Sequence, residues 1–165
     1  MADLEPPDTH YLSFAQGWLD LGNPAEALAE LARIRLPARE HPDVLHLHWR
    51  IHAEQRRWAE ALEIARVLTS VAPDDPISWI DQSYALHELR HTREARSQLL
   101  AVLKRFPDIS IIPYNLACYS CQLGDHQEAI EWLAKAAALA GKDGIKKMAL
   151  GDADLQPLWP TIGKL

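Results

Sequence analysis

Cysteine is scarce in this sequence of 165 residues, and long apolar runs are missing. The two cysteines, Cys118 and Cys121, are too few for the disulfide framework of a small secreted domain. No apolar run reaches the roughly 18 residues that a membrane-spanning helix needs. The first eight residues are acidic and contain two prolines, without the basic start and apolar run of a signal peptide. We therefore expect a cytoplasmic protein that does not bind membranes.

A surplus of basic charge is also missing, because the net charge is −6. Residues 1–32 contain six acids and no lysine or arginine, whereas residues 33–66 contain seven arginines and five acids. Nucleic-acid binding needs a concentrated basic face. Seven arginines spread over two helices and a connection do not provide one, so we expect no nucleic-acid partner.

Catalytic and cofactor-binding motifs are absent too. The sequence has no G-x-S-x-G, no glycine loop that would cradle a phosphate, and no pair of carboxylates with a supporting catalytic signature. We therefore expect no enzymatic activity, no cofactor and no resident metal.

What the sequence does contain is a repeated dipeptide. Glu-Ala stands at 26–27, 60–61, 94–95 and 128–129, each pair 34 residues after the last. A fixed period of this length is typical of stacked helical repeats. We expect one domain over 1–165, with repeats at about 8–41, 42–75, 76–109 and 110–141 and a different segment at 142–165.

Each repeat is predicted to contain two helices on either side of a hinge. Apolar residues recur at intervals of three and four, which is typical of an amphipathic helix, and prolines or glycines follow each pair. The predicted helices span 8–21, 24–35, 42–55, 58–71, 76–89, 92–105, 110–123, 126–139 and 142–150.

Two hinges have the spacing of a capping box. In Asn23-Pro-Ala-Glu26 and Asp125-His-Gln-Glu128, the first side chain is expected to accept a free backbone N–H, and the glutamate to reach back. The preceding glycines, Gly22 and Gly124, suit the end of the helix before the hinge.

Residues 113–136, PYNLACYSCQLGDHQEAIEWLAKA, resemble a tetratricopeptide repeat. So do residues 79–107, with Trp79, Ala95 and Pro107 in the expected columns. The resemblance covers residues 8–141 and implies an all-α fold, an α-α superhelix of four helix-turn-helix units with a C-terminal capping helix. In that tail, Leu155, Leu158 and Trp159 are expected to cover the apolar face of the last repeat.

The resemblance also implies where a partner would bind. In this family the first helices of the units line a concave face that holds peptides or proteins. The positions that match that face are Leu12, Gln16, His46, Arg50, Ile80, Tyr84, His87, Tyr114, Asn115 and Cys118. Tyrosine and arginine are common at binding hot spots, and Arg50 could pair with one carboxylate of a partner.

The leading hypothesis is a non-catalytic module that binds a protein or peptide segment, as an adaptor, a scaffold or a small chaperone. The chain is similar in size to small bacterial tetratricopeptide chaperones of secretion systems, although those usually have fewer repeats. Self-association is a further expectation, because Trp58 and Trp132 can be exposed on the outer side.

The alternative hypothesis is a metal- or thiol-redox-responsive sensor. Cys118-Tyr-Ser-Cys121 is a C-x-x-C motif, and His48 and His52 share one helix face at i and i+4. The cysteines are predicted to lie in the middle of a helix, where no helix dipole lowers the pKa of a thiol. Buried histidines that contribute to packing are the competing interpretation.

Overall fold

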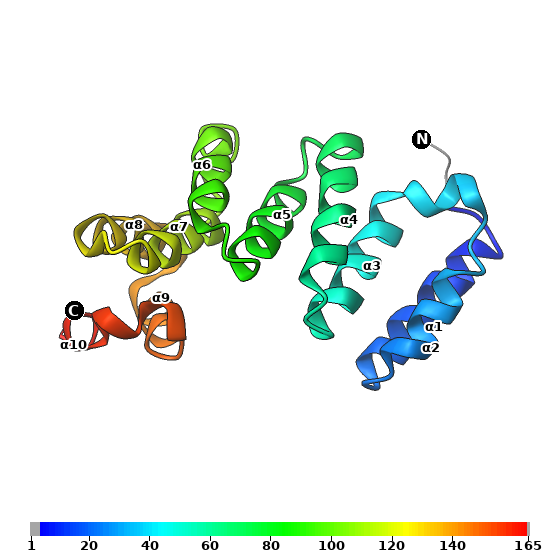
Figure 1. Cartoon of the computed structure of the whole chain (residues 1–165), viewed down its shortest axis with the longest axis horizontal. Coiled ribbons are helices and arrows are strands. Elements are labelled where there is room, and N and C mark those ends of the chain that lie inside the picture. The colour runs from blue at the N-terminus through cyan, green and yellow to red at the C-terminus, as the bar shows by residue number, and fades with distance from the viewer. Residues whose placement is uncertain (1–3, 165) are drawn as a thin grey trace. The chain divides into compact units, whose positions relative to one another are not determined.

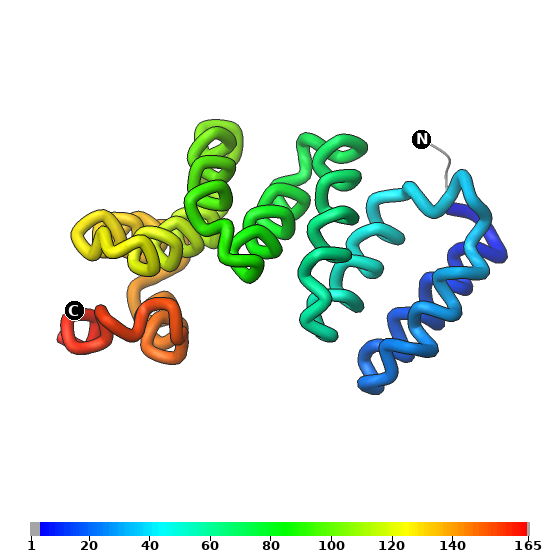
Figure 2. Tube along the Cα trace, in the orientation of Figure 1, coloured from blue at the N-terminus to red at the C-terminus, as the bar shows by residue number. Residues whose placement is uncertain are grey.

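The computed structural model describes residues 4–164, and every regular element within that range is helical. The chain forms two compact units that divide between Ala85 and Leu86. Figures 1 and 2 show the helices and the chain trace. The all-α repeat fold predicted from the sequence is therefore confirmed.

The first unit consists of two helix pairs, a short 3-10 turn and most of a fifth helix. Its elements are α1 (Asp8–Asp20), α2 (Pro24–Leu31), η1 (Leu36–Glu40), α3 (Pro42–Glu54), α4 (Trp58–Val71) and α5 (Pro76–Glu88). Helices α1 and α2 pack against each other, as do α3 and α4.

The second unit begins within α5. It contains α6 (Thr92–Val102), α7 (Ile111–Gln122), α8 (His126–Ala140), α9 (Lys142–Leu150), η2 (Ala153–Leu158) and α10 (Trp159–Ile162). Helix α7 pairs with α8, α9 packs on α8, and the 3-10 turn η2 packs on α7. Within residues 4–164, no helix is both long enough and apolar enough to cross a bilayer.

All four hinges use the same backbone geometry. The second residue after each first helix has a left-handed φ: 74° at Gly22, 56° at Arg56, 68° at Arg90 and 87° at Gly124. The next N–H then donates to the carbonyl five residues back, as from Asn23 to Trp18 at 2.9 Å. This is a Schellman ending, which satisfies the last carbonyls of a helix.

The predicted capping boxes form only in part. The side chains of Asn23 and Asp125 accept the N–H groups of Glu26 and Glu128, at 3.3 and 3.0 Å. No bond from either glutamate back to its cap is found, because the backbone N–H of each cap already serves the Schellman bond. Glu128 instead accepts from Arg96 Nε at 3.1 Å and from Ser120 Oγ at 2.6 Å.

The core follows the 34-residue columns. The alanines of the Glu-Ala pairs, Ala27, Ala61, Ala95 and Ala129, are fully buried where two helices approach. Residues 34, 68, 102 and 136 form a second buried column. The 34-residue period therefore marks the buried residues at which the two helices of each pair pack together.

Helix α2 ends at Leu31, whereas the sequence predicted that it would continue to residue 35. The Asp8 carboxylate is buried, and it accepts the backbone N–H of Arg35 at 3.0 Å and its Nε at 2.7 Å. The N–H of Arg35 therefore cannot continue the helix, and Pro37 disfavours helical backbone at the residue before it. The bond from that N–H also lowers the pKa of Asp8.

Candidate functional site

A hollow of about 770 Å³ lies over α1 and α3 in the first unit. Four of the ten predicted binding residues line it, namely Leu12, Gln16, His46 and Arg50. Leu4, Thr9, Ser13, His41, Asp43 and Leu47 complete the lining. Of these described lining residues, three are leucines and seven are polar or charged, so the hollow offers apolar contact together with several hydrogen-bonding groups.

Arg50 is held in place at one edge of this hollow. Its Nη1 donates to Gln16 Oε1 at 2.9 Å, and its Nη2 lies 3.9 Å from Asp20 Oδ1. Gln16 in turn donates to Asp20 at 2.6 Å. The Arg50 side chain is still 47% exposed, so its guanidinium is oriented and can receive a further acceptor.

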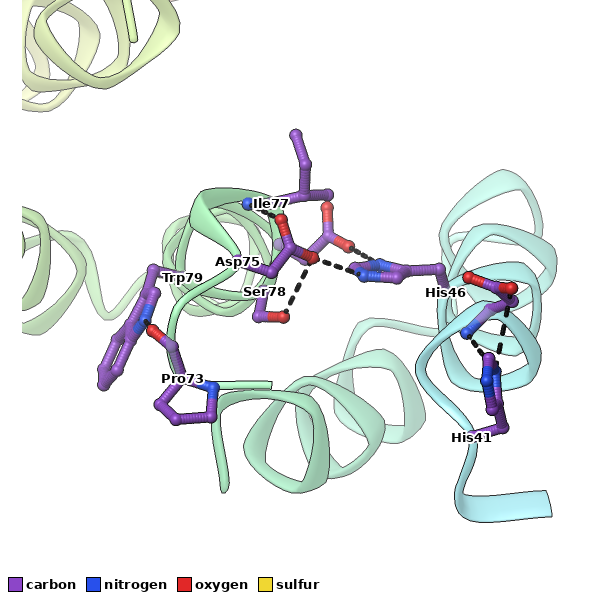
Figure 3. Close-up of polar contacts among 9 residues, drawn as sticks. His41, His46, Pro73, Asp75, Ile77, Ser78 and Trp79 are labelled. Atoms are coloured by element: carbon purple, nitrogen blue, oxygen red, sulfur yellow. Dashed lines mark hydrogen bonds and ion pairs between the residues drawn. The ribbon is translucent and has the colours of Figure 1, made fainter. Parts of the chain in front are cut away.

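His46 bridges two carboxylates, that of Asp75 just before α5 and that of Asp81 within α5. Its Nε2 lies 2.8 Å from Asp75 Oδ2, and its Nδ1 lies 3.3 Å from Asp81 Oδ2. Figure 3 shows the ring directed at Asp75. The hydrogen bond to Asp81, followed by that to Asp75, raises the pKa of His46 against the effect of burial. Burial raises the pKa of Asp81.

Asp75 is also tied to the start of α5. Its Oδ1 accepts the N–H of Ile77 at 3.0 Å, and its Oδ2 accepts from Ser78 Oγ at 3.3 Å (Figure 3). His41 plays the corresponding role at α3, because its Nδ1 accepts the N–H of Asp43 at 3.2 Å. Sequence reasoning missed these residues. The signal was present, since His41-Pro42 and Asp75-Pro76 are 34 residues apart and proline favours the first helical position.

Ile80 and Tyr84 differ in exposure. Ile80 is buried, whereas Tyr84 is 38% exposed. The ring of Tyr84 meets Trp58 and Trp49 edge-on, with centroid distances of 5.5 and 6.5 Å. Tyr84 is thus a partly exposed residue that an aromatic cluster fixes.

The four predicted residues of the second unit, His87, Tyr114, Asn115 and Cys118, are buried. The chain's own C-terminal segment covers three of them. Asp152 Oδ2 accepts from Tyr114 Oη at 2.8 Å and from the Cys118 thiol at 3.5 Å. His87 Nε2 lies 2.9 Å from Asp154 Oδ2.

The same segment determines the state of the cysteines. Burial, then the carboxylates Asp152 and Asp154, raise the pKa of Cys118 and of Cys121, so both thiols stay protonated. Burial also raises the pKa of Tyr114. Within residues 4–164, no group of three or more histidine, cysteine, aspartate or glutamate side chains is placed to hold a metal ion. The sensor hypothesis gains no support from these contacts.

His48 and His52 contact each other, with ring centroids 4.9 Å apart. His52 is buried, and its Nδ1 has no hydrogen-bond partner. Burial lowers the pKa of His48 to about 4, with smaller contributions from His52 and Arg57. The residues at the corresponding positions of the first repeat, Phe14 and Trp18, are exposed.

A protein-family model described as "Tetratricopeptide repeat" matches residues 80–143. No curated protein matches the chain in sequence. Among solved structures, MamA 41-end from Desulfovibrio magneticus RS-1 is similar, with a TM-score of 0.73, 19% identity, and coverage of 99% of this chain and 97% of that chain. TTC0263, a thermophilic TPR protein in Thermus thermophilus, has a TM-score of 0.75 and 19% identity, with 94% and 83% covered.

At these identities, the solved structures are alike in fold. The family match, the 34-residue helix pairs and the shared fold agree with one another. Residues 80–143 thus match the tetratricopeptide repeat family, and the chain as a whole has the fold of tetratricopeptide repeat proteins.

Proposed function

We propose that the protein is a non-catalytic interaction module that binds an extended or helical protein segment over α1 and α3 of its first unit. The observation that carries this proposal is the hollow lined by Leu12, Gln16, His46 and Arg50, with the guanidinium of Arg50 half exposed and held by Gln16. In the second unit, the corresponding residues are buried, three of them in contact with the chain's own tail, so the first unit is the better site.

The chemistry of the hollow indicates the kind of segment that fits. Leu12 and Leu47 offer apolar contact, and Arg50 offers donors to one carboxylate. Arg50 is the one lysine or arginine among the described residues that line the hollow, which is too little for a nucleic-acid backbone. We therefore propose a peptide ligand with one acidic residue near an apolar side chain.

Peptide display against the purified protein tests this proposal. Selected peptides should contain an acid beside an apolar residue, and Arg50→Ala should weaken their binding about tenfold or more, as expected for a hot-spot arginine. Arg66→Ala is the matched control, because Arg66 is similarly exposed on α4 and pairs with Glu63 away from the hollow. Failure to enrich any binder, or equal affinity of wild type and Arg50→Ala, would contradict the proposal.

A further inference from the structure

Helix α1 and its C-cap Leu21 expose an apolar stripe formed by Phe14, Trp18 and Leu21, which are 55%, 38% and 78% exposed. Their spacing of four and three places them on one face of the helix. The positions 34, 68 and 102 residues after Phe14 and Trp18 are buried or half-buried: His48, His52, Gln82, Leu86, Leu116 and Ser120. Phe14 and Trp18 of the stripe therefore occupy positions that are buried or half-buried in the later repeats but exposed in the first.

The pattern has a simple packing cause. Helix α3 packs on both helices of the preceding pair, α1 and α2, and α7 packs on the preceding helix α6. Helix α1 contacts α2 and α3, and these contacts leave Phe14 and Trp18 exposed. Large aromatic side chains on an exposed helix face are unusual, because Phe and Trp are mostly buried in folded proteins. An exposed apolar surface of this kind marks an interaction site.

The second unit has an apolar groove between α8, α9 and α10, with a volume of about 400 Å³. Its lining is Ile130, Leu133, Ala134, Ala137, Ala138, Lys142, Ile145, Lys146, Ala149 and Ile162. The small alanine side chains keep the groove open, and the two lysines are its charged members. None of the described residues that line it is acidic.

The charges of the two surfaces are opposite. Among the acids of residues 1–32, Asp8 is buried against Arg35 and Glu30 pairs with Arg33, so the acids nearest the stripe in the sequence are Asp20 and Glu26. Asp20 and Glu26 are exposed on either side of Leu21 in the sequence. The groove instead has Lys142 and Lys146, of which Lys142 is exposed. An apolar stripe with acidic neighbours thus matches an apolar groove with basic neighbours on the same chain.

We propose that copies of this chain associate head to tail, with the Phe14–Trp18–Leu21 stripe of one copy in the α8–α10 groove of the next. Burial of the aromatic rings drives the contact, and the opposite charges favour the correct pairing. The two surfaces differ, so the contact is heterologous and one copy can bind two others. This association is separate from the peptide site over α1 and α3.

Sedimentation of the full chain over a series of concentrations tests the proposal. The wild type should form species larger than a dimer as concentration rises. Trp18→Glu, which alters the stripe, and Ala138→Lys, which alters the groove, should each remain monomeric. Both positions are exposed, so helix content by circular dichroism should not change. Val67→Glu is the control, because Val67 is 39% exposed on α4 and should leave assembly unchanged.

A mixture of the two variants distinguishes head-to-tail pairing from other arrangements. Trp18→Glu keeps an intact groove, and Ala138→Lys keeps an intact stripe, so together they can make one contact and no more. The mixture should form a one-to-one dimer that does not grow. A monomeric wild type at all concentrations, assembly by either variant alone, or a mixture that stays monomeric would overturn the proposal.

Discussion

Two histidines of α3 that are two residues apart respond to pH in opposite ways. His46 lies between Asp75 and Asp81, and these hydrogen bonds raise its pKa above 6.5. His48 is desolvated, and its pKa falls to about 4. Folding therefore favours the protonated form of one ring and the neutral form of the other, which makes the stability of the first unit depend on pH in two separate windows.

The signs of the two effects follow from linkage. The His46 contribution is complete below its unfolded pKa of 6.5 and is lost as pH rises through the higher folded pKa. The His48 contribution is complete above 6.5 and is lost as pH falls from 6.5 toward about 4. The first ring thus affects stability above pH 6.5, and the second affects it below.

Glutamine substitutions should separate these windows in urea unfolding. His46→Gln should lose less stability than wild type as pH rises from about 6 to 8, because it has no proton to release. His48→Gln should lose less than wild type on acidification from about 7 to 5, by about 1–2 kcal/mol after allowing for solvent screening of a half-buried ring. His10→Gln, on an exposed position of α1, is the control. Parallel pH profiles for all four proteins would contradict this assignment.

At the scale of the element, the sequence period predicts much of the structure. Proline and glycine after each pair, with the apolar spacing, place α4 and α9 at the residues where they are found. The end of α2 was not predictable in this way, because Asp8 binds Arg35 across 27 positions of the chain. Local patterns carry no information on such a contact.

The candidate site shows the same limit. The columns of the repeat predict that Gln16 and Arg50 share a face, and they are 34 residues apart and hydrogen-bonded. They do not predict that Asp152 binds Tyr114, because the tail lies outside the period. The sequence period therefore predicts which equivalent residues of the repeats are exposed only where no segment from outside the repeat, such as the C-terminal tail, packs on them.

The hinges offer a test at this scale. Arg56 and Arg90 have left-handed backbone, where a Cβ costs roughly 1–2 kcal/mol, and glycine occupies the corresponding hinges at Gly22 and Gly124. Arg56→Gly should raise the free energy of unfolding by about 0.5–1 kcal/mol, because relief of this strain is partly offset by the entropy of glycine. Thermal or urea unfolding measures it. The reverse change, Gly22→Ala, should destabilise, and a destabilised Arg56→Gly would show that the hinge is not strained.

At the scale of the whole molecule, the C-terminal tail decides how the second unit differs from the first. Leu155 is fully buried and Leu158 nearly so, and η2 packs on α7. The tail thus supplies a core contact as well as the carboxylates that meet Tyr114 and His87. A segment outside the repeat closes one face of the second unit, whereas the hollow of the first unit is open.

Because the chain forms two compact units, we expect a cavity in one unit to reduce the stability of that unit more than that of the other. Leu155→Ala removes a fully buried side chain from the second unit and should cost about 2–5 kcal/mol there. In a repeat protein each element contacts only its neighbours, so hydrogen exchange should quicken in α6–α10 and stay near wild type in α1–α4. Leu68→Ala, an equally buried position in the first unit, should give the mirror pattern. Equal acceleration of hydrogen exchange along the whole chain in both variants would contradict this expectation. A cavity in one unit can speed exchange in every helix only if all the helices open together, so the two units would then unfold as one.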